Sequence, residues 1–218
     1  RTEASLPSWL TQNAPDEPAP YRYIAPSALV PDQKGFLVPA NTARRSRLKR
    51  GRLIHALLQR LPGLPPDQRR QAGRRFLAME TNLTKTDKIE ILDASLSVLS
   101  APEFAPVFDE RGRSEAAIIG TGEGLPEDMI INGRVDRLIV TDTHVLIVDY
   151  KTDRPPPDRA ENVNPAYLAQ MAAYKAVLAR TYPDHTLSVA LVWTDGPKLM
   201  KLPDHLLEKA LTQTSLSV

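Results

Sequence analysis

The 218-residue sequence contains no cysteine. This absence excludes disulfide bonds, thiolate zinc sites and cysteine-bound iron–sulfur clusters. It also fits a reducing compartment such as the cytoplasm. Long apolar runs are missing too, since no window approaches the roughly 20 apolar residues that span a bilayer. We therefore expect no membrane partner.

The sequence also lacks a secretory signal, an initiator methionine and an ATP-binding loop. It begins RTEASLPSWL at Arg1, without a basic segment followed by an apolar one. We therefore expect a piece of a longer polypeptide or a processed chain. No Gly-x-x-x-x-Gly-Lys-Ser/Thr loop occurs, so we expect no ATP hydrolysis by this part.

Net charge is only +2, which argues against a protein that coats DNA with its whole surface. Basic residues are nevertheless concentrated in two segments without acids, 43–52 and 68–75. Local basic density can hold a phosphate backbone, although a solvated helix face has the same composition. The candidate DNA-binding residues of the first segment are Arg44, Arg45, Arg47, Lys49, Arg50 and Arg52.

The first part of the chain divides into a proline-rich lead-in and a helical part. Seven prolines interrupt residues 1–42, which we expect to form an extended tether that packs along a surface. Residues 43–105 are predicted to be helical because apolar residues recur at helical spacing. We expect Thr86 to cap the helix at 86–100. Its buried stripe should consist of Ile89, Leu92, Leu96 and Leu99.

The period of the pattern changes over residues 106–218. β-Branched runs predict strands at 114–120, 129–140, 144–151, 187–194 and 198–202. Helical spacing predicts helices at 165–182 and 204–211. This order indicates an α/β core with a mixed central sheet flanked by helices. Together with the helical part it would form one domain, 43–218.

Three charged residues fall where two neighbouring strands of this sheet should meet. Asp149 and Lys151 are two residues apart on one strand, so their side chains point to the same face. A tight turn at 141–143 can bring Asp136 of the preceding strand beside Asp149. Charges among aliphatic residues are costly unless they pair or bind a metal. Two carboxylates and a backbone carbonyl suit a hard cation such as Mg²⁺.

The same residues admit a plainer interpretation. Asp149 and Lys151 could form an ordinary ion pair at a strand end, because Asp-x-Lys tripeptides are common by chance. Asp136 could be an ordinary acid near a turn. The pattern of charges alone leaves both interpretations open.

Five motifs, in order, resemble those of the PD-(D/E)XK nuclease superfamily and, within it, the RecB-type branch. They are GRLIH at 51–55, SEAAI at 114–118, GRVDR at 133–137, VDYKTD at 148–153 and QMAAY at 170–174. The resemblance implies a restriction-endonuclease-like fold and metal-dependent hydrolysis of DNA phosphodiester bonds. Five ordered motifs are much harder to obtain by chance than one.

The resemblance also assigns roles at the centre of the site. His55, Asp136, Asp149 and the backbone carbonyl of Tyr150 would bind Mg²⁺, with Mn²⁺ as a competent substitute. Lys151 would be the catalytic lysine. It would position a metal-activated water or stabilise the charge that develops on the phosphate.

Three further residues receive supporting roles from the same resemblance. Gln170 and Tyr174 lie one helical turn apart and would support the site or touch the DNA backbone. Glu115 would lie at the rim and help to hold metal or water. His55, Gln170 and Tyr174 each also fit an ordinary position on a helix surface.

Within the RecB-type branch, the chain resembles most the C-terminal nuclease domain of AddA-type helicase–nucleases. The resemblance rests on GRLIHALLQRLPGLPPDQR (51–69) and on the proline-rich lead-in. It implies a helicase part that precedes this chain, an AddB-type partner subunit and a bacterial cytoplasmic location. The DNA substrate would be the single strand released from unwound duplex ends during double-strand break repair and recombination.

Two alternatives stay open at this point. One is a non-catalytic DNA-binding or docking module that keeps the nuclease fold. The other is a stand-alone exonuclease without a motor. The basic run at 43–52 would contact either DNA or the partner subunit.

Overall fold

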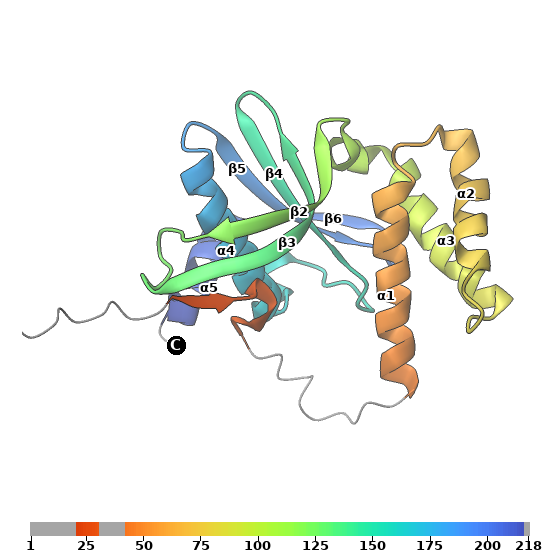
Figure 1. Cartoon of the computed structure of the whole chain (residues 1–218), viewed down its shortest axis with the longest axis horizontal. Coiled ribbons are helices and arrows are strands. Elements are labelled where there is room, and N and C mark those ends of the chain that lie inside the picture. Colours follow the sequence, from red (N-terminus) through yellow and green to blue (C-terminus); the bar gives the residue numbers. More distant parts are fainter. Residues whose placement is uncertain (1–20, 31–41, 216–218) are drawn as a thin grey trace, which may run out of the picture.

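The computed structural model describes residues 21–30 and 42–215, with the backbone alone at 42–44 and 214–215. A six-stranded mixed sheet forms its centre. Helices α1 to α3 cover one face of this sheet, and α4 and α5 cover the other (Figure 1). This is the restriction-endonuclease-like α/β arrangement that the sequence predicts.

The sheet combines parallel and antiparallel pairs. Along the order β1-β3-β4-β5-β6, β1 is parallel to β3 and β4 is parallel to β5. The other pairs are antiparallel, and β2 joins the sheet through β3. The strands are β1 (Arg22–Ile24), β2 (Gly112–Gly120), β3 (Met129–Val140), β4 (His144–Lys151), β5 (Thr186–Trp193) and β6 (Lys198–Lys201).

Five α-helices and three short 3-10 helices complete the described part of the chain. The α-helices are α1 (Thr42–Arg60), α2 (Pro66–Ala78), α3 (Lys85–Ser100), α4 (Pro165–Thr181) and α5 (Asp204–Ser215). The 3-10 helices are η2 (Pro26–Ala28), η3 (Pro102–Phe108) and η4 (Ala160–Asn162). No single helix among the described residues is long and apolar enough to cross a membrane.

The sheet separates two apolar cores, and β4 contributes to both because its side chains alternate. Val145 and Ile147 belong to the core on the α4 side. Val148 and Tyr150 belong to the core on the α1 side. Asp149 continues the first series, so the strand directs this acid toward the α4 side of the sheet.

Helix α3 differs from its prediction at its beginning and on its buried face. Thr84, not Thr86, caps the helix, and it exchanges hydrogen bonds with Asp87 in a capping box. Ile89 is 60% exposed, and the fully buried positions are Ile91, Leu92, Ser95 and Val98. The predicted stripe was wrong at Ile89 because α3 is covered by two helices, α1 and α2, which shifts its buried face.

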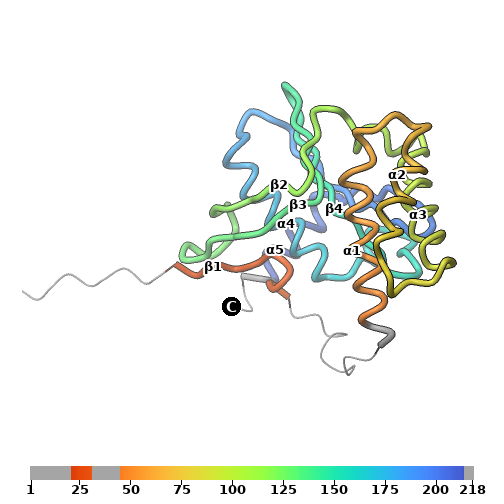
Figure 2. The backbone as a smooth tube through the Cα atoms, turned by 45° about the vertical axis from the view of Figure 1, so that its right-hand side comes forward, coloured from red at the N-terminus to blue at the C-terminus, as the bar shows by residue number. Residues whose placement is uncertain are grey.

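Part of the lead-in belongs to the sheet. Strand β1 pairs with the first three residues of β3. Pro26 and Leu29 are buried, and Arg22 forms an ion pair with Asp128. The tube view shows this segment lying under the β2–β3 hairpin (Figure 2). Residues 1–20 and 31–41 lie outside the described residues, so for them the tether stays a prediction.

Candidate active site

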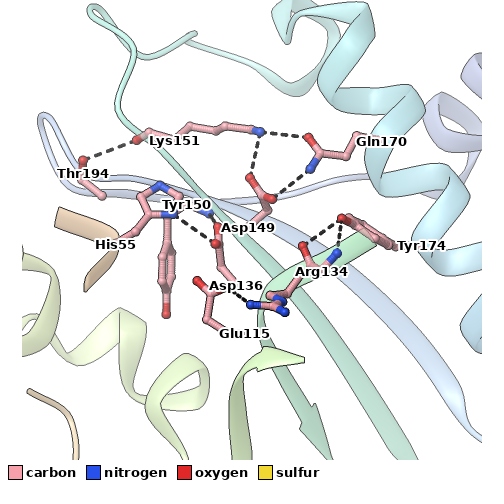
Figure 3. Close-up of polar contacts among 10 residues, drawn as sticks. All are labelled: His55, Glu115, Arg134, Asp136, Asp149, Tyr150, Lys151, Gln170, Tyr174 and Thr194. Atoms are coloured by element: carbon pink, nitrogen blue, oxygen red, sulfur yellow. Dashed lines mark hydrogen bonds and ion pairs between the residues drawn. The ribbon is translucent and has the colours of Figure 1, made fainter. Parts of the chain in front are cut away.

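The two acids that the sequence places on neighbouring strands lie in one polar cluster at the end of the β3–β4 pairing (Figure 3). Strands β3 and β4 pair with Arg137 opposite Val148. Asp136 and Asp149 are the next residues on the two strands beyond this last pair, and the charge of Asp136 acts on Asp149. Their side chains are only 13% and 7% exposed. The close-up shows both carboxylates in one polar cluster (Figure 3).

Asp136 joins helix α1 to the end of β4. Its Oδ1 lies 3.0 Å from His55 Nδ1, and its Oδ2 accepts a hydrogen bond of 2.6 Å from the Tyr150 amide. Tyr150 packs its ring on the α1 side, where it meets the His55 ring edge-on. The tyrosine therefore offers its backbone to the site, and its ring positions the histidine.

A glycine allows helix α1 to come close to β4. A Cβ atom on Gly51 would lie 3.0 Å from Thr152 Oγ1, which is tighter than ordinary van der Waals contact. His55 follows one helical turn later on the same side of the helix. The Gly and His of the GRLIH motif thus belong to one arrangement, in which close approach brings the imidazole to Asp136.

Lys151, Asp149 and Gln170 form a closed ring of contacts. The Lys151 ammonium lies 2.8 Å from Asp149 Oδ2 and donates to Gln170 Oε1 at 3.1 Å. The Gln170 amide donates to Asp149 Oδ1 at 3.2 Å. The ammonium also lies 3.8 Å from the centre of the Tyr167 ring, at cation–π distance. Figure 3 shows the contacts of this lysine with Asp149 and Gln170, and Tyr167 adds a third.

Burial and like charge perturb the ionisable groups of the cluster. Burial raises the pKa of Asp149, Lys151 opposes this shift, and Asp136 adds to it. For His55, burial lowers the pKa, but the hydrogen bond and charge of Asp136 outweigh it and raise the pKa overall. The cluster holds two carboxylates where burial disfavours charge, so a bound cation would stabilise both.

Tyr174 lies beside this cluster and holds the backbone of β3. Its hydroxyl donates to the Arg134 carbonyl at 2.8 Å and accepts from the Arg134 amide at 3.0 Å. A Cβ atom on Gly133 would lie 2.7 Å from this hydroxyl, so the glycine makes room for it. The tyrosine thereby fixes the strand two residues before Asp136.

Glu115 lies at the rim of the site in a strained backbone conformation. Its φ of +53° is in the left-handed region, which non-glycine residues rarely adopt. Such residues typically cost about 1–3 kcal/mol and are concentrated at functional sites. Its carboxylate lies 3.7 Å from Arg134 and borders the same groove as His55.

Sequence reasoning missed Tyr167 and the role of Arg137. Tyr167 precedes Gln170 and Tyr174 by three and seven residues, and this helical spacing was a usable signal. Arg137, the last residue of GRVDR, points away from the acids. It is 5% exposed and donates to the carbonyls of Val107 and Asp109 and to the Ser114 hydroxyl. It therefore anchors η3 to the sheet.

The side chains of the cluster include oxygen and nitrogen donors of the kind that bind divalent cations. Among the described residues, no three His, Asp or Glu side chains stand together as a ready-made metal site. His55 Nδ1 and Asp136 Oδ1 are nevertheless 3.0 Å apart, which is about the spacing of neighbouring ligands around octahedral Mg²⁺. Asp149 is held by Lys151 and Gln170, but each of its oxygens keeps lone pairs. In its chemistry, the set fits a hard cation.

A groove of about 1370 Å³ opens beside the cluster. It is bordered by α1, by the segment that follows β4, including Thr152, and by Tyr167 of α4. Of the basic run, Arg47, Arg50 and Arg52 border this groove. Lys49 instead pairs with Glu80, Arg45 is exposed, and the side chain of Arg44 lies outside those described.

Comparisons with known proteins identify the family. A sequence model of the PD-(D/E)XK nuclease superfamily matches residues 20–213, so the chain belongs to this superfamily. A search of curated proteins found no match. Similar solved structures include the crystal structure of SSO0001, which is 13% identical. That match covers 81% of this chain and 85% of the other, with a TM-score of 0.34.

Proposed function

We propose that this domain hydrolyses DNA phosphodiester bonds with the help of Mg²⁺, for which Mn²⁺ can substitute. The observation that supports the proposal best is the position of Lys151. Its ammonium is held 2.8 Å from Asp149, in the same cluster as the His55–Asp136 pair. An ammonium beside two buried acids is the arrangement expected for hydrolysis at a phosphate.

Each residue then has a physical task. His55, Asp136, Asp149 and the Tyr150 carbonyl would hold the cation, which would supply polarisation of the scissile phosphate and activation of a water molecule. Lys151 orients the attacking water or stabilises the negative charge that develops on the phosphate.

The residues around Lys151 and Asp136 restrict their motion. Gln170 bridges Lys151 and Asp149, so it keeps the amine aimed at the cluster. Tyr167 covers the same amine with its ring. Tyr174 holds the backbone that carries Asp136, and Glu115 borders the groove through which the substrate enters.

We further propose that the domain is the RecB-type nuclease part of an AddA-type helicase–nuclease. The segment 51–69 supports this narrower assignment, and the absence of cysteine argues against the RecB-type relatives that carry an iron–sulfur cluster on four cysteines. A helicase part would precede this chain, an AddB-type subunit would be its partner, and the single strand from unwound duplex ends would be its substrate. The setting would be break repair and recombination in the bacterial cytoplasm.

The test of the activity is cleavage of an end-labelled single-stranded oligonucleotide with Mg²⁺ and with EDTA. We expect Mg²⁺-dependent cleavage, a loss of at least about 100-fold in Lys151→Ala, and no change in the matched control Lys201→Ala. Lys201 is exposed on β6, outside the cluster. Equal rates in the two variants would refute the mechanism. Binding without cleavage by the wild type would favour the non-catalytic alternative.

The test of the AddA-type assignment uses the reading frame and the partner. We expect a Gly-x-x-x-x-Gly-Lys-Ser/Thr loop in the coding sequence upstream of Arg1 and co-purification with an AddB-type subunit. An upstream sequence without such a loop would favour a stand-alone exonuclease.

A further inference from the structure

Two arginines from distant parts of the chain converge on one carboxylate oxygen near the cluster. Arg154 Nη2 lies 2.7 Å from Asp195 Oδ1, and Arg50 Nη2 lies 3.4 Å from the same atom. Arg50 belongs to α1, Arg154 follows β4, and Asp195 lies in the turn between β5 and β6. Three segments therefore meet at this oxygen.

Two guanidinium groups share this one carboxylate, which leaves the three side chains with a net charge of +1, and the charge of Glu90 also acts on Arg50. The Arg50 side chain is only 17% exposed, and its Nε is buried without a hydrogen-bond partner among the described residues. Burial lowers the pKa of Arg50, and the nearby Arg154 lowers it further. A second anion would relieve this repulsion and use the free N–H groups, which suit phosphate oxygens.

The two arginines border the same groove as the cluster. Arg50 precedes His55 by five residues, which is about 7.5 Å along the axis of α1. Arg154 follows Lys151 by three residues. Both arginines are therefore tied to the segments that carry the catalytic candidates, close enough to meet the same DNA strand.

We infer that Arg50 and Arg154 form a binding subsite for a backbone phosphate that flanks the scissile phosphate. The Asp195 carboxylate occupies this subsite in the free protein, and the phosphate of a bound nucleic-acid strand displaces it. The inference rests on the proposed function, because it takes the strand to be the substrate.

The test measures binding without cleavage. Fluorescence anisotropy of a 5′-fluorescein 20-mer of thymidine, in EDTA, gives the dissociation constant at several salt concentrations. We expect Asp195→Asn to tighten binding about 3- to 10-fold by removing the competing carboxylate. Arg154→Gln should weaken binding and reduce the slope of log affinity against log salt by about 0.7.

A matched control pair lies on the far side of α1. Arg70 and Asp93 join α2 to α3 with a separation of 2.8 Å, away from the groove. Asp93→Asn changes net charge as much as Asp195→Asn, and Arg70→Gln as much as Arg154→Gln. Although Arg70 belongs to the basic segment 68–75, it is paired with Asp93 and does not border the groove, so we expect wild-type affinity and salt slope for both control variants.

The outcomes separate this inference from the nuclease proposal. If Asp195→Asn binds no tighter than Asp93→Asn, or if Arg154→Gln keeps the wild-type salt slope, the subsite does not exist. A wild type that binds the oligonucleotide normally but does not cleave it with Mg²⁺ contradicts only the proposed activity. The test uses Arg154→Gln and not Arg50→Gln because the Arg154 side chain is 51% exposed, so its substitution should not impair folding.

Discussion

Two buried tyrosines next to the site have hydroxyls in opposite situations. The Tyr174 hydroxyl makes two hydrogen bonds with the backbone of Arg134. The Tyr150 hydroxyl is buried without a partner among the described residues. A satisfied buried hydroxyl stabilises the fold, whereas an unsatisfied one has lost its hydration without compensation. Removal of the Tyr174 hydroxyl should therefore lower the stability of the fold, whereas removal of the Tyr150 hydroxyl should not.

We expect Tyr174→Phe to lower the free energy of unfolding by about 1–3 kcal/mol, because it leaves backbone groups of Arg134 unpaired. Its matched control Tyr150→Phe should leave stability unchanged or raise it by up to about 1 kcal/mol. Urea denaturation of both variants checks this pair. Equal destabilisation by the two substitutions would show that the assigned hydrogen bonds are wrong.

The His55–Asp136 pair makes stability depend on pH. The pKa of His55 is raised in the folded state, so the pair stabilises the fold below the ordinary histidine value, 6.5. This contribution is lost as the pH rises through the raised pKa. Asp136 also raises the pKa of Asp149, so replacing Asp136 relieves a penalty at high pH. Both the loss of the His55–Asp136 pair and the relief of Asp149 make the loss of Asp136 more destabilising at low pH than at high pH.

In metal-free buffer, Asp136→Asn should therefore destabilise the protein more at pH 6 than at pH 9. Urea denaturation at the two pH values measures the difference, and NMR titration of His55 should show a lower pKa in the variant. Asparagine can still accept the hydrogen bond from Tyr150, but it then turns its NH2 group toward His55, so the variant removes both the charge and the acceptor from the pair. A larger destabilisation at pH 9 would contradict the pairing.

At the residue scale, the sequence predicted those contacts that follow from local geometry. Strand alternation and a short turn were sufficient to bring Asp136, Asp149 and Lys151 together. The hydroxyl of Tyr174 on the backbone of β3, and the two arginines on Asp195, were not predictable in this way. Their distances depend on how helices pack against the sheet, which residue spacing does not determine.

Close approach between elements is what the glycines of the motifs provide. Beside β3, a Cβ atom on Gly133 would lie 2.7 Å from both Pro26 Cδ and Tyr174 Oη. Gly133 therefore lets η2 and α4 approach the strand that carries Asp136. Gly63, in the turn after α1, has no atom within 4 Å of such a Cβ.

We expect Gly133→Ala to destabilise the protein by about 1–3 kcal/mol and to lower cleavage, because the added methyl group displaces Tyr174 or Pro26. Gly63→Ala should change the stability by no more than about 0.5 kcal/mol and the cleavage rate by no more than about twofold. Thermal unfolding and the cleavage assay test both variants. Wild-type stability in Gly133→Ala would show that the packing is looser than described.

Element prediction succeeded where a repeating pattern extended over many residues. The strands at 129–140 and 144–151 were confirmed at both ends. The start of α3 was wrong although a signal was available, because a capping box requires an acid three residues after the cap. Thr84 has Asp87 at that position, whereas Thr86 has Ile89.

At the scale of the whole molecule, residues 21–30 close the fold beside β3. Leu29 is 5% exposed in the α4-side core, and Pro26 packs against Gly133. Proline-rich composition predicted an extended segment but could not reveal its pairing, because the partner strand is about a hundred residues away. The matched family also begins near this segment, at residue 20.

A chain that begins at residue 31 should therefore be less stable than one that begins at residue 21. Burial of Leu29 alone contributes about 1.5–3 kcal/mol, so the melting temperature should fall by at least about 4 °C. Calorimetry of the two chains gives the comparison. Equal melting temperatures would mean that β1 and η2 do not contribute to the folded domain.

The central claim is that His55, Asp136 and Asp149 converge to hold a divalent cation beside Lys151. The most direct measurement is an anomalous difference map from crystals soaked in Mn²⁺. We predict a peak at coordination distance from both carboxylates and the imidazole, and its loss in Asp136→Ala. A Mn²⁺ peak elsewhere, with none between these three side chains, would contradict the claim.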